Sequence, residues 1–251
     1  MTSWITPDWP SPDNIGCAIT TRQGGCSARP FDSNNLALHV GDTEADVWAN
    51  RQALMNGLGL NQQPLWLEQV HGTQVVYAPE AGPELRADAS FSDQPGPACV
   101  VMTADCLPVL FCNRQGTEVA AAHAGWRGLC QGILRETLAR FTQPEQVMAY
   151  LGPAIGPDKF EVGAEVLQAF IEGAQNAQQI EAIQTAFMPT QQGKYLADLY
   201  VLARAELMSC GLSAIYGGDY CTLTDAERFY SYRREAVTGR MATLIWLKNN
   251  Q

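Results

Sequence analysis

Short runs rich in valine alternate with helical segments along the chain, and this alternation limits the folds that are available to it. Gly, Pro, Asn or Asp residues bound each run, which is typical of β-strands. The predicted strands cover residues 15–21, 65–70, 74–78, 99–104, 109–112, 118–122 and 147–151. No internal repeat or Pro/Gly/Ser-rich linker interrupts the pattern, so we expect a single domain over residues 1–251. Strands interleaved with helices predict a layered α/β or α+β fold.

Four segments carry helical signals. The first starts at a sequence that resembles a capping box, residues 43–46, and stops near Gly57 and Gly59. The other three place apolar side chains on one helical face and cover residues 129–141, 162–171 and 199–208. The Gln-rich stretch 174–193 has weak periodicity, so we expect an exposed connection that contains a short helix.

Acidic residues outnumber basic ones, with 26 Asp plus Glu against 16 Lys plus Arg and a formal charge of −10. This balance argues against a nucleic-acid-binding protein, which needs a basic surface to displace counterions. The N-terminus lacks a secretory signal, and no apolar run approaches the roughly 18 residues of a membrane span. The eight cysteines include no C-x-x-C pair, which is typical of reduced thiols. We therefore expect a cytoplasmic protein with no membrane or nucleic-acid partner.

Histidine is scarce, and each of the three histidines has an informative setting. His71 directly follows a predicted strand, and His123 ends a strand of small residues before a glycine-bounded turn. Asp105 and Cys106 follow another predicted strand. The ends of strands in layered α/β proteins are where functional sites are usually assembled. His39 lies in a loop-like segment, where it is either a substrate contact or a simple loop histidine.

His71, Cys106 and His123 are compatible with three kinds of site. Imidazole and thiolate are good zinc ligands, and three protein ligands leave a fourth position for water or substrate. The same residues could instead be a buried cysteine and two hydrogen-bonded histidines without a metal. A third interpretation makes Cys106 a nucleophile and His123 its base, as in a cysteine hydrolase. The spacing of the residues leaves these alternatives open.

Several arginines are candidates for binding phosphate or a sugar. Arg22 lies in a turn with two glycines, Arg127 follows Trp126, and Arg233, Arg234 and Arg240 cluster near the C-terminus. The alternative for each of them is an ion pair with an acidic side chain on the surface.

Seven motifs occur in order and resemble the laccase-domain family, which is also called the polyphenol oxidase or purine nucleoside phosphorylase family. They are TRQGG at 21–25, NLALHVGD at 35–42, QVHG at 69–72, TADC at 103–106, HAGWRG at 123–128, LGPAIG at 151–156 and FYSYRR at 229–234. The resemblance covers nearly the whole chain. It implies an α+β fold, a layered α/β/β/α sandwich of two mixed sheets with outer helices, like the catalytic domain of the cytotoxic necrotizing factor.

The resemblance also implies that His71, Cys106 and His123 bind a metal ion, usually zinc. Family members are credited with phosphorolysis of adenosine, inosine and methylthioadenosine and with deamination of adenosine, and some are linked to editing of peptidoglycan precursors. The copper-oxidase label is older. A multicopper oxidase needs many imidazole ligands, whereas this chain has three histidines. His71, Cys106 and His123 could hold one copper ion. We therefore expect zinc, with copper as the alternative, and purine nucleosides and phosphate as substrates.

Within this framework Cys106, His123 and Asp105 are the expected catalytic residues. Asp105 would serve either as an acid–base group or as the partner that orients a histidine. The expected contacts to phosphate or ribose are Arg22, His39, Arg233, Arg234 and Arg240. A metal-independent Cys106–His123 hydrolase that acts on peptidoglycan precursors is the rival enzyme class, and a binding protein without activity is the third class.

Overall fold

The computed structural model describes residues 3–82 and 85–248, and three sheets organise them. A four-stranded sheet has the order β1 (Trp4–Ile5), β2 (Ile15–Thr20), β13 (Met241–Leu247) and β5 (Cys99–Thr103), and its neighbouring strands are all antiparallel. A six-stranded sheet has the order β12 (Ile215–Gly217), β8 (Val147–Leu151), β6 (Leu107–Asn113), β7 (Val119–Ala124), β4 (Ala89–Ser92) and β3 (Val75–Tyr77). Its outermost pairs are parallel and its inner pairs antiparallel.

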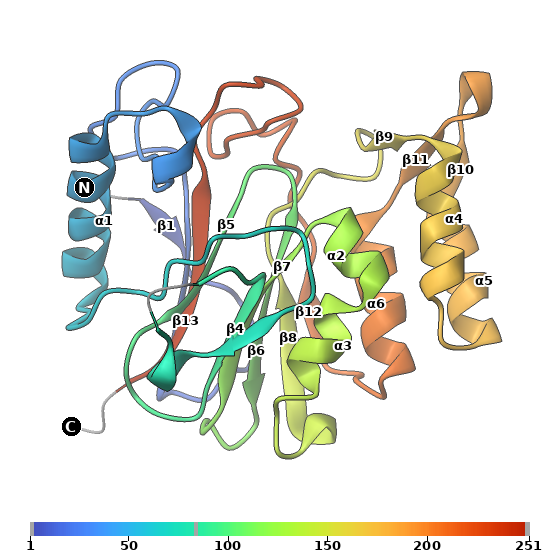
Figure 1. Ribbon diagram of the computed structural model, residues 1–251, viewed down its shortest axis with the longest axis horizontal. Coiled ribbons are helices and arrows are strands. Elements are labelled where there is room, and N and C mark those ends of the chain that lie inside the picture. Colours follow the sequence, from blue (N-terminus) through green and yellow to red (C-terminus); the bar gives the residue numbers. More distant parts are fainter. Residues whose placement is uncertain (1–2, 83–84, 249–251) are drawn as a thin grey trace.

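The two large sheets face each other, and helices cover their outer faces (Figure 1). Helix α1 (Glu44–Leu58) lies on the four-stranded sheet. Helices α2 (Trp126–Gln131), α3 (Ile133–Leu138) and α6 (Leu199–Ser209) lie on the six-stranded sheet. Farther out are α4 (Ala164–Gly173), α5 (Ala177–Thr185) and the small antiparallel sheet of β10 (Phe187–Pro189), β11 (Tyr195–Ala197) and β9 (Glu161–Val162).

This layering confirms the predicted α+β fold with outer helices. The prediction of two mixed sheets needs one correction, because the four-stranded sheet is antiparallel throughout and only the six-stranded sheet is mixed. The small third sheet was not predicted. The likeness to the cytotoxic necrotizing factor domain stays a prediction.

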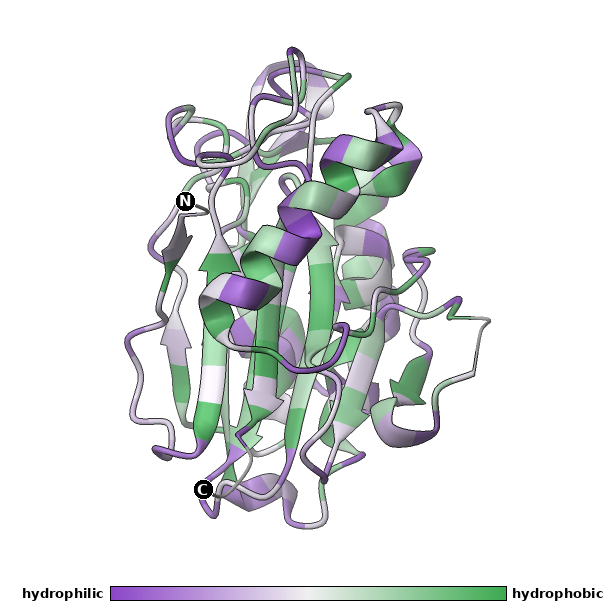
Figure 2. Ribbon diagram, turned by 90° about the vertical axis from the view of Figure 1, so that its left-hand side faces the viewer, coloured by the Kyte–Doolittle hydropathy of each residue, from purple (hydrophilic) through white to green (hydrophobic). Residues whose placement is uncertain are grey.

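Alternation along the strands divides the apolar residues between two faces of each sheet. In β13, Ala242 and Leu244 pack toward α1, whereas Ile245 and Leu247 point into the core between the sheets. Figure 2 shows α1 crossing in front of these largely apolar strands. In β7 the same alternation sends Ala120, Ala122 and Ala124 toward the outer helices, so that His123 lies on the opposite face.

Two local predictions are wrong for physical reasons, and a third is incomplete. Residues 65–70 form only isolated bridges, because the backbone beyond Glu68 turns to donate hydrogen bonds to a carboxylate. The predicted helix 129–141 begins earlier, at Trp126, and is broken at Gly132, whose φ of +99° belongs to the left-handed region. The Gln-rich stretch contains the expected short helix, α5, but also strand β10.

The helices that the structure describes are too short or too polar to cross a membrane, and α1, at 15 residues, is the longest of them.

Candidate metal centre

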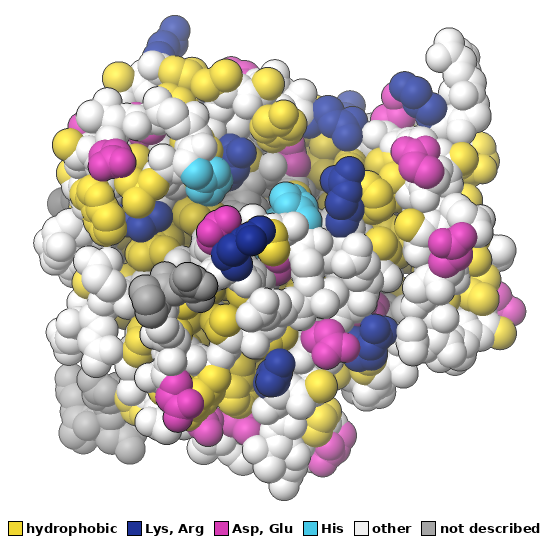
Figure 3. Space-filling model, viewed as in Figure 1, with side chains coloured by type: hydrophobic (Ala, Val, Ile, Leu, Met, Phe, Trp, Pro, Cys, Tyr) yellow, Lys and Arg dark blue, Asp and Glu magenta, His cyan; other side chains and the backbone are white. Residues whose placement is uncertain are grey.

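A cleft of about 390 Å³ opens where β5 and β7 end and β6 begins. This volume is within the range of small-molecule sites. Figure 3 shows histidine and arginine side chains around a hollow on this face of the molecule. The cleft is lined by His39, Gln69, His71, Met102, Thr103, Ala104, Asp105, Cys106, His123, Trp126, Arg127, Ile155, Phe160, Tyr232, Arg233 and Arg240.

The structure brings His71, Cys106 and His123 together on one wall of the cleft. Their ligand atoms lie within 4.8 Å of one another, and the Cys106 Sγ is 3.9 Å from the His71 Nε2. The ligand atoms of a tetrahedral zinc ion with bond lengths of about 2.0–2.3 Å lie closer together than this, so binding would draw the three side chains inward. Two imidazoles and a thiolate with an open cleft beside them fit a three-ligand zinc site.

Gly125 makes this convergence possible because it lies directly behind the three side chains. A Cβ atom at this position would lie 2.8 Å from the His71 Cδ2 and 3.1 Å from the Cys106 Sγ. The glycine follows β7 and precedes α2, so the turn that ends the strand also leaves room for the ligands.

Asp88 is a functional candidate that the sequence prediction missed. Its fully buried carboxylate accepts hydrogen bonds from the backbone N–H groups of Val70, His71 and Gly72, and the His123 Nδ1 lies 2.8 Å from its Oδ1. Burial by itself raises the pKa of this carboxyl, but the bonds from His123 and Gly72 outweigh it and hold the pKa below its usual 3.8. An acid inside the small-residue run at 87–89 was the available signal.

Cys106 and His123 stabilise each other's charged forms. Burial raises the pKa of the Cys106 thiol, but the charge of His123 and the hydrogen bonds from His123 and His71 prevail and lower it from 9.0 to about 6. Burial lowers the pKa of His123, but the Cys106 thiolate and Asp88 prevail and raise it to about 9. A thiolate is the form of cysteine that binds metal ions and attacks electrophiles.

The structure separates the predicted phosphate-binding residues into two groups. Arg233, Arg240 and His39 line the cleft. Arg22 and Arg234 lie outside the lining of the cleft, and Arg22 pairs with an aspartate there. The guanidinium groups of Arg22 and Arg234 bind backbone carbonyl groups, as do those of Arg233 and Arg240.

Asp105 lines the cleft but uses its carboxylate to hold another loop. The carboxylate accepts hydrogen bonds from the Thr222 and Ser231 hydroxyls and from the Arg233 backbone N–H. The carboxylate that contacts His123 is that of Asp88, and the Asp105 carboxylate has no hydrogen bond to either histidine of the cluster in the described part of the chain. An acid–base role for Asp105 stays a prediction.

Arg127, one of the candidate phosphate-binding arginines, completes the cleft together with three aromatic residues that were not predicted. The Arg127 guanidinium lies 4.5 Å from the centre of the Trp126 ring and has no hydrogen-bond or ion-pair partner within residues 3–82 and 85–248. The Arg233 guanidinium lies over the Phe160 ring. The Arg240 guanidinium lies over the Tyr232 ring. The HAGWRG motif contains Arg127 and was the signal for it.

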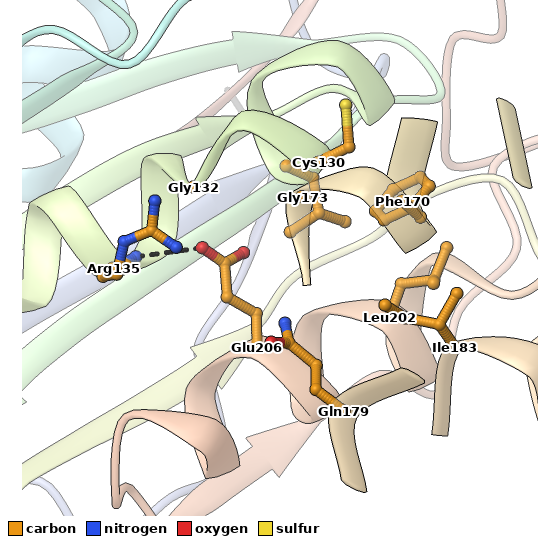
Figure 4. Close-up of a pocket in the computed structure, with 10 residues that line it drawn as sticks. Cys130, Gly132, Arg135, Phe170, Gly173, Gln179, Ile183, Leu202 and Glu206 are labelled. Atoms are coloured by element: carbon orange, nitrogen blue, oxygen red, sulfur yellow. Dashed lines mark hydrogen bonds between the residues drawn. The ribbon is translucent and has the colours of Figure 1, made fainter. Parts of the chain in front are cut away.

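A second cavity, of about 10 Å³, has room for little more than a water molecule. Figure 4 shows it among α2, α3, α4, α5 and α6, with the Glu206 carboxylate beside the Arg135 backbone. The Glu206 Oε1 accepts a hydrogen bond from the Arg135 N–H, and its Oε2 has no partner in the described part of the chain. Burial raises the pKa of Glu206 from 4.5 to about 8, and the Arg135 N–H offsets this only in part.

Glu206 should make the protein less stable as the pH rises. The folded protein keeps this proton to a higher pH than the unfolded chain, so the free energy of unfolding falls between the unfolded pKa of 4.5 and the folded pKa of about 8. In Glu206→Gln this decline should be smaller, whereas Glu44→Gln, a change at an exposed residue of α1, should retain it. Urea unfolding measured from about pH 5 to about pH 8, which lies between the unfolded and folded pKa values of Glu206, tests the prediction. Equal declines of the free energy of unfolding in all three proteins would contradict it.

Gly125→Ala should lower zinc affinity about 10-fold or more while leaving the protein folded. The new methyl group would push against His71 and Cys106, which lie 2.8 and 3.1 Å from its position. Gly96→Ala is the matched control, because the nearest atom to its added Cβ is 4.0 Å away. Titration against a chromophoric chelator measures both affinities, and wild-type affinity in Gly125→Ala would disprove the tight fit.

Cys106 in the metal-free protein should be alkylated at unusually low pH. Its alkylation rate should rise through a midpoint near the pKa of about 6, and zinc should suppress the reaction. Cys99 and Cys112, whose burial raises their pKa to about 12, should stay unmodified. Peptide mass spectrometry after brief iodoacetamide treatment gives the rates, and a midpoint near the ordinary thiol value of 9.0 would rule out the stabilised thiolate.

Comparisons with known proteins agree on one family. Residues 16–248 match the family described as multi-copper polyphenol oxidoreductase laccase. The chain is 52% identical over 249 residues to the Escherichia coli K12 protein named purine nucleoside phosphorylase YfiH, with 98% of this chain and 100% of that protein covered. It is 50% identical over 253 residues to the Pseudomonas aeruginosa protein named purine nucleoside phosphorylase PA4543, with 99% of this chain and 100% of that protein covered.

A solved structure supports the same assignment. The Neisseria meningitidis protein NMB0706 matches with a TM-score of 0.92 and 50% identity, over 98% of this chain and 99% of that one. The family predicted from the seven motifs is therefore confirmed, and the chain belongs to the multi-copper polyphenol oxidoreductase laccase family.

Proposed function

We propose that this protein is a zinc-dependent purine nucleoside phosphorylase that cleaves adenosine, inosine and methylthioadenosine and also deaminates adenosine. The names of the relatives at about 50% identity support the phosphorylase activity. The observation that carries the proposal is the juxtaposition of the His71–Cys106–His123 cluster with three arginines in one cleft of nucleoside size.

The cleft suits an anionic reactant although the protein is acidic overall. Arg127, Arg233 and Arg240 line it, and none of them pairs with a carboxylate within the described residues. The one acid in the lining, Asp105, is bound to hydroxyl and backbone donors of a neighbouring loop. Guanidinium groups bind phosphate oxygens through pairs of hydrogen bonds, so these arginines are suited to phosphate.

Aromatic side chains in the same cleft suit the purine. Trp126, Phe160 and Tyr232 contribute ring surfaces, and each lies against an arginine. Flat apolar surfaces bind a purine by stacking, while its polar edges reach nearby side chains such as His39. A nucleoside and phosphate would therefore meet between the arginines and the ligand cluster.

In phosphorolysis a phosphate oxygen forms a bond to C1′ of the ribose as the bond from C1′ to the purine N9 breaks. Arg127, Arg233 and Arg240 would hold the phosphate in line with this bond, which lowers the entropic part of the barrier. The leaving purine gains a proton, and the products are the free base and ribose 1-phosphate. In deamination water replaces the 6-amino group, which leaves as ammonia.

His71, Cys106 and His123 would hold the zinc ion, and Asp88 would keep the His123 Nε2 free by binding its Nδ1–H. A bound zinc ion acts as a Lewis acid and lowers the pKa of a water ligand toward 7. Copper is the alternative metal, since the same donors accept it. Oxidation of phenols by a multicopper cluster is not supported, because the chain has three histidines.

A Cys–His hydrolase acting on an amide of a peptidoglycan precursor is the second candidate. The favouring observation is that the Cys106 Sγ lies within 4.8 Å of a ring nitrogen of His123, whose Nδ1 contacts the Asp88 carboxylate. This is the order of nucleophile, base and orienting acid in cysteine hydrolases. A bound zinc ion would block this chemistry by occupying the thiolate, so metal content separates the two candidates.

The test is incubation of the protein, purified without added metal or chelator, with adenosine in the presence and absence of phosphate. We expect adenine and ribose 1-phosphate only with phosphate, inosine in both cases, and about one zinc per chain, as for a three-ligand site. Cys106→Ala and His123→Ala should lose zinc together with product formation. Cys26→Ala, a change at an exposed cysteine outside the cleft, should keep both.

A metal-free protein that gives no nucleoside product but has a reactive Cys106 would contradict the phosphorylase. That outcome would favour the hydrolase. Zinc-dependent formation of inosine without ribose 1-phosphate would restrict the activity to deamination.

A further inference from the structure

We propose that Asp88 is the positioning residue of the metal centre, and that its single carboxylate sets the geometry of two of the three ligands. The proposal rests on the metal-binding part of the proposed function and not on the identity of the substrate. Asp88 lines no part of the cleft and so cannot touch a substrate there.

Asp88 contacts His123 through both its carboxylate and its backbone carbonyl. The His123 Nδ1 lies 2.8 Å from the Asp88 Oδ1, and the His123 backbone N–H donates to the Asp88 carbonyl at 2.7 Å. The side chain and the backbone of this ligand are therefore both held by one residue. Because a carboxylate only accepts hydrogen bonds, Nδ1 must carry a proton, and Nε2 is the nitrogen available to a metal.

Asp88 also holds the backbone of His71, which lies 17 residues earlier in the sequence. Asp88 accepts hydrogen bonds from the N–H groups of Val70, His71 and Gly72 at 3.2, 2.9 and 2.7 Å. His71 has a φ of +61°, in the left-handed region that a non-glycine residue adopts at a cost. Three consecutive donors to one buried carboxylate hold the segment in this conformation, which directs the His71 side chain toward Cys106.

The neutral amide of asparagine cannot replace the Asp88 carboxylate, because it accepts hydrogen bonds at only one of its two terminal atoms. In Asp88→Asn the amide oxygen could accept from His123 and His71, but the amide N–H₂ would then face the donors of Gly72 and Val70. The flipped amide would face the His123 Nδ1 instead. Either orientation sets donor against donor, so at least one of the two ligands should lose its position.

Asp88→Asn should therefore bind zinc about 10- to 100-fold more weakly than the wild type, the usual effect of removing a carboxylate that orients a ligand histidine. Glu118→Gln is the matched control. Glu118 is also a buried carboxylate that accepts several hydrogen bonds, and it lies just before β7, the strand that carries His123 near its other end. The Glu118→Gln substitution should lower the free energy of unfolding without changing the affinity for zinc.

Zinc affinity is measured by competition with a chromophoric chelator, with circular dichroism as the check on folding. Cobalt substitution gives a second signal, because the thiolate-to-cobalt absorption of Cys106 should persist in Asp88→Asn, with altered ligand-field bands and weaker binding. Wild-type affinity and bands in a folded Asp88→Asn would overturn the proposal, whatever its activity toward nucleosides. Weak binding in Asp88→Asn together with a wild-type protein that does not cleave nucleosides would leave the proposal standing and reject only the proposed reaction.

A measurement on the wild-type protein covers the case in which Asp88→Asn does not fold. Nitrogen-15 NMR of the zinc-loaded protein should show His123 with a protonated Nδ1 and a metal-bound Nε2. It should also show the amides of His71 and Gly72 protected from exchange. Metal bound at the His123 Nδ1, or rapid exchange at these amides, would overturn the proposal.

Discussion

The antiparallel register between β6 and β7 determines where the candidate metal ligands lie. Leu107 pairs with Ala124, and Pro108 pairs with His123, so Cys106 and His123 meet at the same end of the hairpin. Because side chains alternate between faces, a slip of one residue would turn His123 toward the outer helices. The alanines of β7 that pack against those helices, and the large apolar residues of β6, make such a slip costly. The packing of the core thus fixes the position of the site.

Asp88 extends this order to a segment that belongs to no sheet. The backbone of residues 70–72 follows a stretch with only isolated bridges, and it is held by the Asp88 carboxylate rather than by a neighbouring strand. A buried carboxylate is costly unless its oxygens are satisfied, and four donors satisfy this one, namely the N–H groups of residues 70–72 and the His123 Nδ1. The same four contacts join His71 and His123, two candidate ligands that are far apart in the sequence.

Sequence reasoning grouped His71, Cys106 and His123 as candidate ligands because each follows or ends a strand-like run, a property visible in the local sequence, and the structure brings the three together. It could not separate Arg233 and Arg240, which line the cleft, from Arg22 and Arg234, which lie outside it. All four look alike in sequence, and only tertiary contacts distinguish them. Asp88 was missed for the same reason, since its partners lie 16 to 35 residues away along the chain. The break of the predicted helix 129–141 at Gly132 depends on a backbone angle that composition only hints at.

X-ray absorption at the zinc edge, on protein loaded with one equivalent of zinc, tests the metal centre most directly. A centre built from His71, Cys106 and His123 predicts one sulfur at about 2.3 Å, two imidazole nitrogens at about 2.0–2.1 Å and one further light atom. A spectrum without sulfur, or one that fits a six-coordinate shell of oxygen atoms, would contradict the assignment of these three residues as the metal ligands.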